Sequence, residues 1–318
     1  MNEFFIINKY LKNLSLNDAG AFKLNDDIFF DYKKKIAISV DTYVYGVHFL
    51  STKPIYFLKK IIRASLSDLY CKGIKPKSYF LSFSLSKKLA THSWFKNISK
   101  VLRSEQLKFN ITLVGGDTVY SSKLIVTVVV LGGSVNYPVL RKGCSLNDDI
   151  YVTGDIGDSY IGLNVLKKKY SFGKLNVFYK KKYYEPNLPT KIYSYLYKIA
   201  SSSIDISDGL GQDLNHLCKM SKFGAFINLN LLPLSTFTKQ LVLANKIKIN
   251  DIFSKGDDYQ ILFTSKIRNR SKINSLSKKL KTRISRIGYI KKENNIVFNY
   301  NHRKLKINPK KMGYTHKF

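Results

Sequence analysis

Residues 204–210 read Ile-Asp-Ile-Ser-Asp-Gly-Leu, a short apolar run that leads into two aspartates, a serine and a glycine. Residues 114–118, Val-Gly-Gly-Asp-Thr, use the same residue types. We expect Asp41 and Asp117 to follow strands directly, and loops at strand ends are where α/β proteins place ligand sites. The pattern therefore indicates one site built from several segments. Four further clusters share it: Asn25-Asp26-Asp27, Ser39-Val40-Asp41-Thr42, Ser65-Leu66-Ser67-Asp68 and Gly256-Asp257-Asp258-Tyr259.

Helical and strand patterns alternate around these clusters. Apolar spacing predicts helices over residues 4–14, 55–72, 92–107, 160–169, 190–200 and 210–222. Alternating or β-branched runs predict strands over residues 28–30, 36–40, 79–85, 111–114, 124–131, 149–153, 225–229 and 259–263. Residues 170–190 and the basic tail from 265 remain ambiguous. Gly132-Gly133 and Pro138 favour a boundary, so we expect two α/β domains, residues 1–137 and 138–318.

Aspartate outnumbers glutamate strongly, because only four of the 21 acidic residues are Glu. Codon bias does not explain this preference, since A/T-rich codons encode both residues. A short carboxylate on a tight loop suits Mg²⁺, which requires near-octahedral oxygen geometry. Any single cluster could equally be a helix N-cap or an Asx turn. Six converging clusters would repel one another, however, and they therefore predict bound cations and polyphosphate.

The net charge of +33 suggests a nucleic-acid or membrane surface at first sight. Only eight of the 54 basic residues are arginine, however, and the lysines are spread along the chain. Phosphate and base recognition would favour arginine, so we interpret the excess as lysine drift and predict no nucleic-acid partner. No apolar run is long enough for a membrane span, and the N-terminus lacks the features of a signal peptide. Three widely spaced cysteines favour the cytoplasm.

Several enzyme classes are excluded by missing motifs. The chain has no GxxxxGK[ST] phosphate loop, no protein-kinase motif set, no GxSxG elbow and no HExxH. Its five histidines are scattered and indicate no zinc site. A phosphate-handling enzyme of this kind must therefore rely on the aspartate clusters themselves.

Taken in order, the clusters resemble thiamine-monophosphate kinase, a family of the aminoimidazole ribonucleotide synthetase superfamily. The similarity runs from about residue 24 to 263, with an echo at Gly313-Tyr314. The segment at Gly46-Val47-His48-Phe49 favours this kinase within the superfamily. Other matching segments are Asp41 to Phe49, Val114 to Thr118, Ile204 to Leu210, and Tyr151 to Gly154 followed by Gly157-Asp158-Ser159 and Gly162-Leu163.

The resemblance implies a two-domain α/β (α+β) fold whose N-terminal domain binds ATP and Mg²⁺ and dimerises through its sheet. It implies a kinase that forms thiamine diphosphate from ATP and thiamine monophosphate, the last step in the biosynthesis of that cofactor. The implied Mg²⁺ ligands are Asp27, Ser39, the Val40 carbonyl, Asp41, Asp68, Asp117, Asp205 and Asp208. The implied nucleotide contacts are Gly116, Asp117, Arg141 and Ser207, and the residues facing the thiamine phosphate are His48 and Asp257.

The acceptor is itself a phosphate and is mostly dianionic at pH 7, so no general base is needed. Repulsion between two anions is the main obstacle, and Mg²⁺ would neutralise it and align both groups for in-line transfer. We therefore predict no catalytic histidine and no phosphoenzyme. We expect a homodimer in the cytoplasm.

The chain departs from the family pattern at four places. Asn25 replaces a glycine, and because asparagine tolerates φ > 0 we expect a left-handed turn there. Ser65 replaces an asparagine, and Asp257 replaces a glutamate. A C-terminal Trp that packs on the substrate is absent, with Lys311 or Met312 nearby. The open alternatives are a related synthetase, such as aminoimidazole ribonucleotide or selenophosphate synthetase, a nucleic-acid-binding protein, and an inactive relative.

Overall fold

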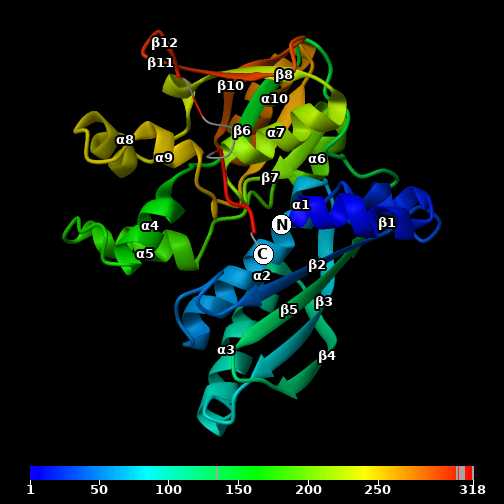
Figure 1. The fold of residues 1–318 in the computed structure, drawn as a ribbon, viewed down its shortest axis with the longest axis vertical. Coiled ribbons are helices and arrows are strands. Elements are labelled where there is room, and N and C mark those ends of the chain that lie inside the picture. Colours follow the sequence, from blue (N-terminus) through cyan, green and yellow to red (C-terminus); the bar gives the residue numbers. More distant parts are fainter. Residues whose placement is uncertain (134, 306, 308–311, 317–318) are drawn as a thin grey trace.

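The computed structural model describes residues 1–133, 135–305, 307 and 312–316. Two β-sheets dominate these residues, one in each half of the chain. Figure 1 shows the N-terminal sheet below the C-terminal sheet, with α2 (Pro54–Cys71) at the level where they meet. The chain passes from the first sheet to the second through the segment between β5 (Ile125–Gly133) and β6 (Asp149–Thr153). We propose that the domain boundary lies in this segment.

The N-terminal sheet has the order β1-β2-β5-β3-β4. Its other strands are β1 (Phe29–Asp31), β2 (Ile36–Val44), β3 (Lys75–Leu85) and β4 (Thr112–Tyr120). β2 and β5 pair antiparallel over nine residues each, from Ile36↔Gly133 to Val44↔Ile125. β3 and β4 are parallel, because α3 (His92–Phe109) connects them as a crossover helix.

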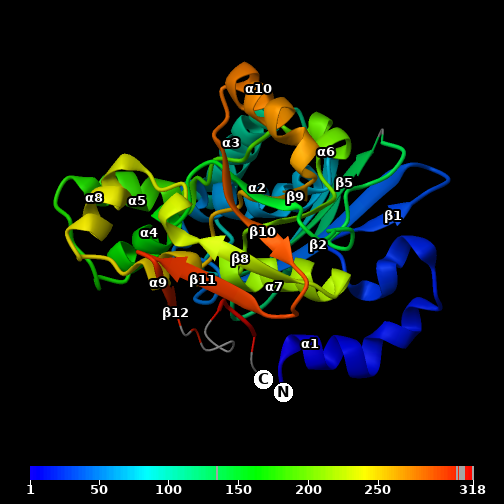
Figure 2. The same ribbon diagram turned by 90° about the horizontal axis from the view of Figure 1, so that it is seen from above.

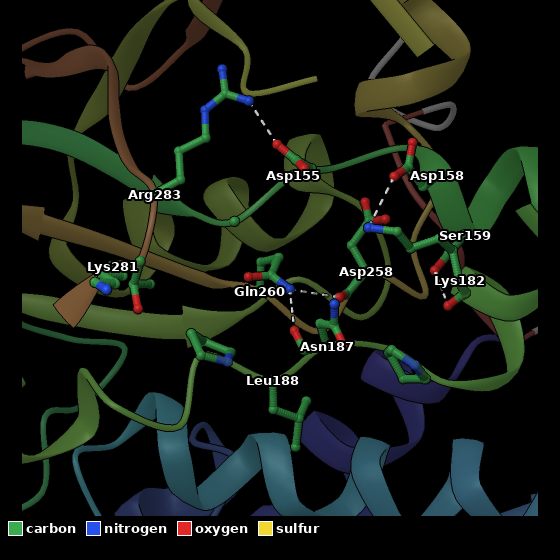
Figure 3. A pocket seen from close by; sticks show the side chains of 14 residues that line it. Asp155, Asp158, Ser159, Lys182, Asn187, Leu188, Asp258, Gln260, Lys281 and Arg283 are labelled. Atoms are coloured by element: carbon green, nitrogen blue, oxygen red, sulfur yellow. Dashed lines mark hydrogen bonds and ion pairs between the residues drawn. The ribbon is translucent and has the colours of Figure 1, made fainter. Parts of the chain in front are cut away.

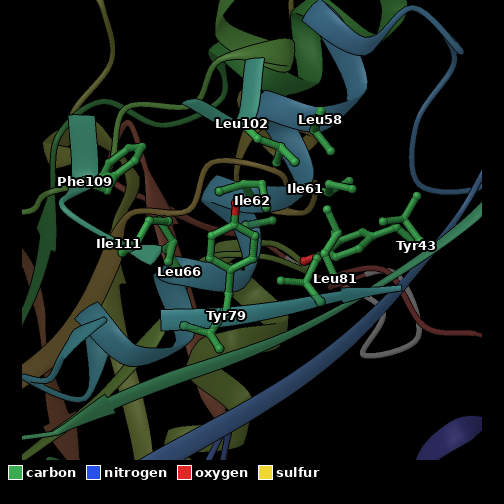
Figure 4. Close-up of a cluster of buried hydrophobic side chains, with 14 of the residues drawn as sticks. Tyr43, Leu58, Ile61, Ile62, Leu66, Tyr79, Leu81, Leu102, Phe109 and Ile111 are labelled. Carbon is green, nitrogen blue, oxygen red and sulfur yellow. The ribbon is translucent and has the colours of Figure 1, made fainter. Parts of the chain in front are cut away.

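One face of this sheet carries the N-terminal core. α2 contributes Leu58, Ile61, Ile62 and Leu66, which pack against strand residues such as Tyr79 (Figure 4). These α2 residues recur with helical spacing, so they form one apolar stripe. The outer face of the sheet, which turns away from α2, has no helix over it in the described chain (Figure 1).

The C-terminal sheet has the order β12-β11-β8-β10-β6-β9-β7. Alternate residues of β6 enter different cores, since Ile150 and Val152 pack with one cluster and Tyr151 with another. α7 (Leu210–Ser221) therefore covers one face, while α6 (Tyr193–Ile199) and α10 (Arg270–Leu280) cover the other. The remaining strands are β7 (Ser202–Asp205), β8 (Gly224–Asn228), β9 (Ile261–Ser265), β10 (Ile284–Lys291), β11 (Ile296–Tyr300) and β12 (Arg303–Leu305).

Four short helices gather at one end of the C-terminal sheet (Figures 1 and 2). They are α4 (Asp158–Leu166), α5 (Leu175–Tyr184), α8 (Thr236–Leu243) and α9 (Ile249–Phe253). The N-terminal segment comprises α1 (Glu3–Ile6), a π-helical turn over Ile7–Leu11 and 3₁₀ turns over Lys12–Ser15 and Ala19–Leu24. Both chain ends meet on one side of the molecule (Figure 2), where the Glu3 amide donates to the His316 carbonyl at 3.4 Å.

The strands expected from periodicity are present, but two expectations about them were wrong. Asp41 and Asp117 do not follow strands; they lie inside β2 and β4. In β2 the residues after Asp41 are Thr, Tyr and Val, which favour a strand and extend it. The left-handed turn expected at Asn25 was also wrong, since φ is −113° there and is positive at Phe22, Lys23 and Leu24 instead.

Other differences concern the segments with weak patterns. The helix expected over residues 4–14 is split into α1, the π-helical turn over Ile7–Leu11 and the 3₁₀ turn over Lys12–Ser15. Residues 170–190 contain α5, and the tail contains α10 and three strands. No helix in the described ranges is long and apolar enough to cross a membrane.

Candidate active site

One face of α2 looks toward the C-terminal domain and places polar side chains between the domains. Ser67 donates to Asp205 Oδ2 at 2.6 Å, which joins α2 to the end of β7. Lys72, directly after the helix, donates to the Ser203 carbonyl at 2.7 Å. Polar and charged groups therefore form this contact between α2 and the C-terminal sheet.

Carboxylates from three separate segments converge there. Oxygen atoms of Asp27, Asp68 and Asp205 lie within 4.8 Å of one another. Asp27 precedes β1, Asp68 lies on α2 and Asp205 ends β7. Asp41 faces the same space from β2 and accepts a hydrogen bond from the Tyr43 hydroxyl at 3.0 Å. We refer to Asp27, Asp41, Asp68 and Asp205 as the aspartate cluster.

Neighbouring hydroxyl groups orient the cluster. The Ser39 hydroxyl donates to Asp68 Oδ2 from β2. Ser39, Asp41 and Tyr43 are alternate residues of one strand, so their side chains share the face that looks at α2. Ser65, one of the departures that the resemblance implies, is buried and lies 3.0 Å from the Tyr43 hydroxyl. A hydroxyl therefore fills this position.

Two basic side chains that touch the cluster balance part of its charge. Lys72 Nζ lies 2.8 Å from Asp26 Oδ1 and 2.6 Å from Asp27 Oδ2, with its side chain fully buried. The Arg141 guanidinium binds Asp27 Oδ1, and its backbone amide donates to Asp26 Oδ2 at 2.8 Å. Arg141 Nε is buried and makes no hydrogen bond within the described residues. It is a free donor for an anion.

The carboxyl pKa values show how crowded the negative charge is. Burial, together with Asp41 and Asp205, raises the pKa of Asp68 well above its ordinary value. Burial and the Asp27 charge raise the pKa of Asp205 to about 7. Asp27 differs: burial disfavours its ionisation, but the charges of Arg141 and Lys72 outweigh burial and hold its pKa well below the usual range. The cluster therefore carries more carboxylates than its two cations satisfy.

The donor set fits Mg²⁺. Carboxylate and hydroxyl oxygens from several segments are hard ligands, and a divalent cation would relieve the repulsion that raises the pKa of Asp68 and Asp205. Ser39 and the Val40 carbonyl lie beside these carboxylates on β2. Their roles as metal ligands remain predictions.

The loop between β7 and α7 extends the site. Its residues Ser207 and Asp208 are half-buried, and burial raises the pKa of Asp208 to about 7, with a contribution from Glu3. The Ser207 carbonyl accepts from the Asp257 amide at 2.9 Å, which ties this loop to the loop at 256–259. Gly256 is required for this contact, because a Cβ there would lie 1.7 Å from the Ser207 oxygen.

The two residues predicted to face the thiamine phosphate also come together, around a buried lysine. Asp257 Oδ1 lies 2.7 Å from Lys60 Nζ, on the first half of α2. His48 Nδ1 accepts from the Val44 amide at 2.9 Å. Its pKa is lowered by burial, by His316 and by Lys60. The Tyr183 hydroxyl donates to the His48 carbonyl at 3.2 Å. We refer to His48, Lys60, Tyr183 and Asp257 as the Lys60 cluster.

Gly116 and Asp117, both in β4, lie apart from the aspartate cluster in the structure. The register aligns Asp117 with Ser82, and through it with Thr127 and Thr42, on the sheet face that turns away from α2. β4 is also separated from β2 by three strand spacings, about 14 Å. Within one chain, Asp117 therefore does not join the aspartate cluster.

The C-terminal tail reaches the Lys60 cluster. His316 Nε2 lies 3.3 Å from His48 Nε2, and the Tyr314 ring packs edge-on against His316. Met312 is buried in the C-terminal core and does not line the site, while Lys311 lies outside the described residues. Tyr314 belongs to the echo of the family pattern at Gly313-Tyr314, but the sequence interpretation gave it no role in the site, and it did not single out His316.

A separate pocket of about 220 Å³ lies between the loop after β6 and residues 186–189 (Figure 3). Its charged groups are mostly paired with one another: Arg283 contacts Asp155 at 2.6 Å and Lys182 contacts Asp158 at 3.3 Å. Asp258 accepts from the Gly157 amide at 2.9 Å, so it supports the loop. This pocket contains no residue of the aspartate cluster.

Comparisons with known proteins identify relatives of similar sequence and fold. The family model "AIR synthase related protein, N-terminal domain" matches residues 17–133. A thiamine-monophosphate kinase of Buchnera aphidicola subsp. Schizaphis graminum is 36% identical, over 99% of this chain and 98% of the relative. The crystal structure of thiamine monophosphate kinase from Aquifex aeolicus has a TM-score of 0.81 at 26% identity, over 96% of this chain and 98% of that chain.

A second solved structure, described as AaThiL complexed with AMPPCP and TMP, has a TM-score of 0.82 at 25% identity. It covers 99% of this chain and 97% of that chain. The fold is therefore that of the aminoimidazole ribonucleotide synthetase superfamily, with mixed α/β content in two sheets. Because the similarity to the Buchnera enzyme extends over nearly the full length of both proteins, this chain belongs to the thiamine-monophosphate kinase family.

Proposed function

We propose that this protein transfers the γ-phosphoryl group of ATP to thiamine monophosphate and forms thiamine diphosphate, as the last step of thiamine diphosphate biosynthesis in the cytoplasm. The observation that carries the proposal is the convergence of Asp27, Asp68 and Asp205 where the two domains meet. The relatives named above are thiamine-monophosphate kinases, and one related structure is described as a complex with AMPPCP and TMP. Both substrates are phosphates, which matches a site rich in Mg²⁺ ligands.

Different residues along α2 and around it are assigned to the metal, the nucleotide and the acceptor. We assign Mg²⁺ binding to the aspartate cluster, with Ser39, the Val40 carbonyl and Asp208. Bound Mg²⁺ would supply the charge neutralisation that two phosphate groups require. Arg141 and Ser207 are assigned to the nucleotide, in agreement with the free Nε donor of Arg141. His48 and Asp257 are assigned to thiamine monophosphate, so the substrate would lie along α2.

Transfer is proposed to be direct. The acceptor phosphate is largely ionised at pH 7, and no hydrogen bond joins a histidine to the aspartate cluster in the described residues. Burial lowers the pKa of His48, and its Nδ1 is occupied as the acceptor for the Val44 amide, which suits binding better than proton transfer. Protein that becomes labelled by γ-labelled ATP would contradict direct transfer.

We also propose a homodimer formed through the N-terminal sheet. Its outer face exposes apolar side chains that one chain leaves uncovered, including Val40 at 61%, Phe80 at 39% and Val119 at 47%. Asp117 lies on the same face, too far from its own aspartate cluster to share an ion. A partner packed on this face would cover these apolar side chains and place Asp117 and Gly116 of both chains at the interface, and their assignment to the nucleotide remains a proposal.

The activity is tested with purified chain, ATP and Mg²⁺, using thiamine monophosphate or thiamine as the acceptor. We expect thiamine diphosphate only from the monophosphate, and none when EDTA removes the metal. Asp205→Asn should lower kcat by about 100-fold or more, because it removes a ligand needed for positioned phosphates. The matched control Asp155→Asn alters an aspartate paired with Arg283 outside the site and should retain activity.

Mixing two inactive variants tests the dimer. If Asp117 acts on the partner's site, combining Asp117→Asn with Asp205→Asn chains restores about one quarter of wild-type activity, because half the random dimers contain one intact site of two. If Asp117 acts within its own chain, mixing restores nothing. Light scattering on the wild-type chain supplies the oligomeric state independently.

A further inference from the structure

Lys60 is a buried charge that the proposed chemistry does not yet explain. Its side chain is 1% exposed, and its Nζ lies 3.6 Å from the centroid of the Tyr183 ring. The ammonium forms an ion pair with Asp257 Oδ1 at 2.7 Å, but it makes no contact with hydrogen-bond geometry in the described residues. Burial lowers its pKa, and Asp257 opposes that effect. A charge buried at this cost requires a reason.

Asp257 is held in a strained loop. Its φ is 71° and that of Tyr259 is 51°, values that non-glycine residues adopt only when their surroundings enforce them. The Tyr259 hydroxyl donates to Asp257 Oδ1 at 2.9 Å. Lys60 and Tyr259 therefore both hold Oδ1, and the described residues give Oδ2 no hydrogen bond or ion pair. The Asp257 side chain remains 27% exposed, so it is not sealed from a ligand, and Oδ2 is its oxygen without a partner in the described residues.

The position of Lys60 on α2 determines which part of the substrate it affects. Lys60 and Asp68 are eight residues apart, about 12 Å along the helix axis. Both side chains tilt toward the helix N-terminus, and because lysine is the longer of the two, the tilt carries its Nζ further from the Asp68 carboxylate. Lys60 therefore acts at the end of the site remote from the phosphate-binding aspartates, where the ring system of the acceptor would lie.

We propose that Lys60 is a positioning residue for the acceptor substrate, a role that rests on the proposed function: by holding Oδ1 of Asp257, it directs the free Oδ2 toward the cationic thiamine portion. The thiazolium ring carries a permanent positive charge, and the aminopyrimidine ring carries an amino donor. A fixed carboxylate oxygen recognises both kinds of group. Tyr183 completes the arrangement by packing its ring against the ammonium.

The test is Lys60→Met, which keeps the length of the side chain and removes its charge. We expect the KM for thiamine monophosphate to rise about tenfold or more, from the loss of a charge-assisted contact, while kcat and the KM for ATP change by less than about twofold. The inhibition constant of unphosphorylated thiamine should rise by the same factor. Lys59→Met is the matched control, because Lys59 pairs with Glu185 at 2.9 Å on a partly exposed edge, and all constants should be retained.

A double-mutant cycle isolates the coupling to Asp257. In an Asp257→Asn background, adding Lys60→Met should change the KM for thiamine monophosphate by less than about twofold, because the partner carboxylate is already gone. Tyr259→Phe removes the second contact to Oδ1 and should reproduce the KM effect if Lys60→Met does not fold.

Three results overturn the assignment of Lys60. The first is an unchanged KM for thiamine monophosphate in Lys60→Met. The second is an equal rise of that KM on adding Lys60→Met to the wild type and to the Asp257→Asn variant. The third is a raised KM for thiamine monophosphate with an unchanged inhibition constant for thiamine, which would place Lys60 on the phosphate. If the wild-type chain forms thiamine diphosphate, these results leave the proposed function intact. A wild-type chain that forms none overturns both.

Discussion

Replacing Lys72 by methionine should destabilise the metal-free protein strongly. The fully buried Nζ contacts Asp26 at 2.8 Å, Asp27 at 2.6 Å and the Ser203 carbonyl at 2.7 Å. Methionine has nearly the same length and volume, so the change removes charge and donors with little steric disturbance. Two buried carboxylates and one carbonyl then lose their contact with Nζ.

The expected loss in the free energy of unfolding depends on which contacts of Asp26 and Asp27 remain in Lys72→Met. Removing one partner of a buried ion pair costs about 3–5 kcal/mol, because the other charge is left uncompensated. Arg141 still binds Asp27 through its guanidinium and Asp26 through its backbone amide, so we expect the lower end, about 3 kcal/mol. Lys59→Met is the control, since its pair with Glu185 is partly exposed and should contribute less than about 1 kcal/mol.

The assay is urea unfolding followed by circular dichroism, in EDTA and again with Mg²⁺. In EDTA the Lys72→Met midpoint should fall well below those of the wild type and the Lys59→Met control. Mg²⁺ should recover part of the loss, because a cation bound only by the folded state stabilises it. If Lys72→Met and Lys59→Met unfold at the same urea concentration in EDTA, the claim that Lys72 compensates the buried carboxylates is refuted.

Two further predictions concern the cluster and its loop. The pKa values of Asp205 and Asp208 are about 7 in the folded chain, against 3.8 ordinarily, so the folded state keeps protons that the unfolded state loses, and metal-free stability falls as pH rises toward 7. Mg²⁺ should therefore raise the Tm more at pH 8 than at pH 6, and a thermal shift that shrinks with pH would contradict this. Gly256→Ala should lower activity by about 100-fold, because its Cβ would lie 1.7 Å from the Ser207 oxygen and displace that loop. Gly173→Ala, where nothing lies within 4 Å, should cost only about 1 kcal/mol for its left-handed backbone and leave activity intact.

Much of the fold could be predicted from local pattern. α2 and α3 have apolar residues at helical spacing, and the strands of the first sheet alternate or are β-branched, so their periodicity indicates them directly. The tail stayed ambiguous because β11 and β12 are short, and because neither they nor the eight residues of β10 alternate strictly between apolar and polar residues. The ends of β2 and β4 were misplaced because polar aspartates inside a strand look like loop residues when pairing is unknown.

The site was predicted in part. Asp27, Asp41, Asp68 and Asp205 belong to the predicted set of metal ligands, and the structure brings these four together. Asp117, from the same predicted set, lies apart from them within one chain. Their role in metal binding remains a prediction, as does the absence of a nucleic-acid partner. Lys60 and Lys72 were missed, because two lysines cannot be singled out among so many by sequence. Only burial and contact distances distinguish them.

The sequence by itself determined that aspartates recur beside glycine and serine at the ends of apolar runs, and hence that cations and phosphates are expected. Tertiary structure alone decided which carboxylates meet, because Asp27, Asp68 and Asp205 come from segments up to 178 residues apart whose approach depends on interdomain packing. It also decided that Asp117 faces away from them, since that face is set by strand register, in which a shift of one residue reverses every side chain. Local periodicity contains neither kind of information.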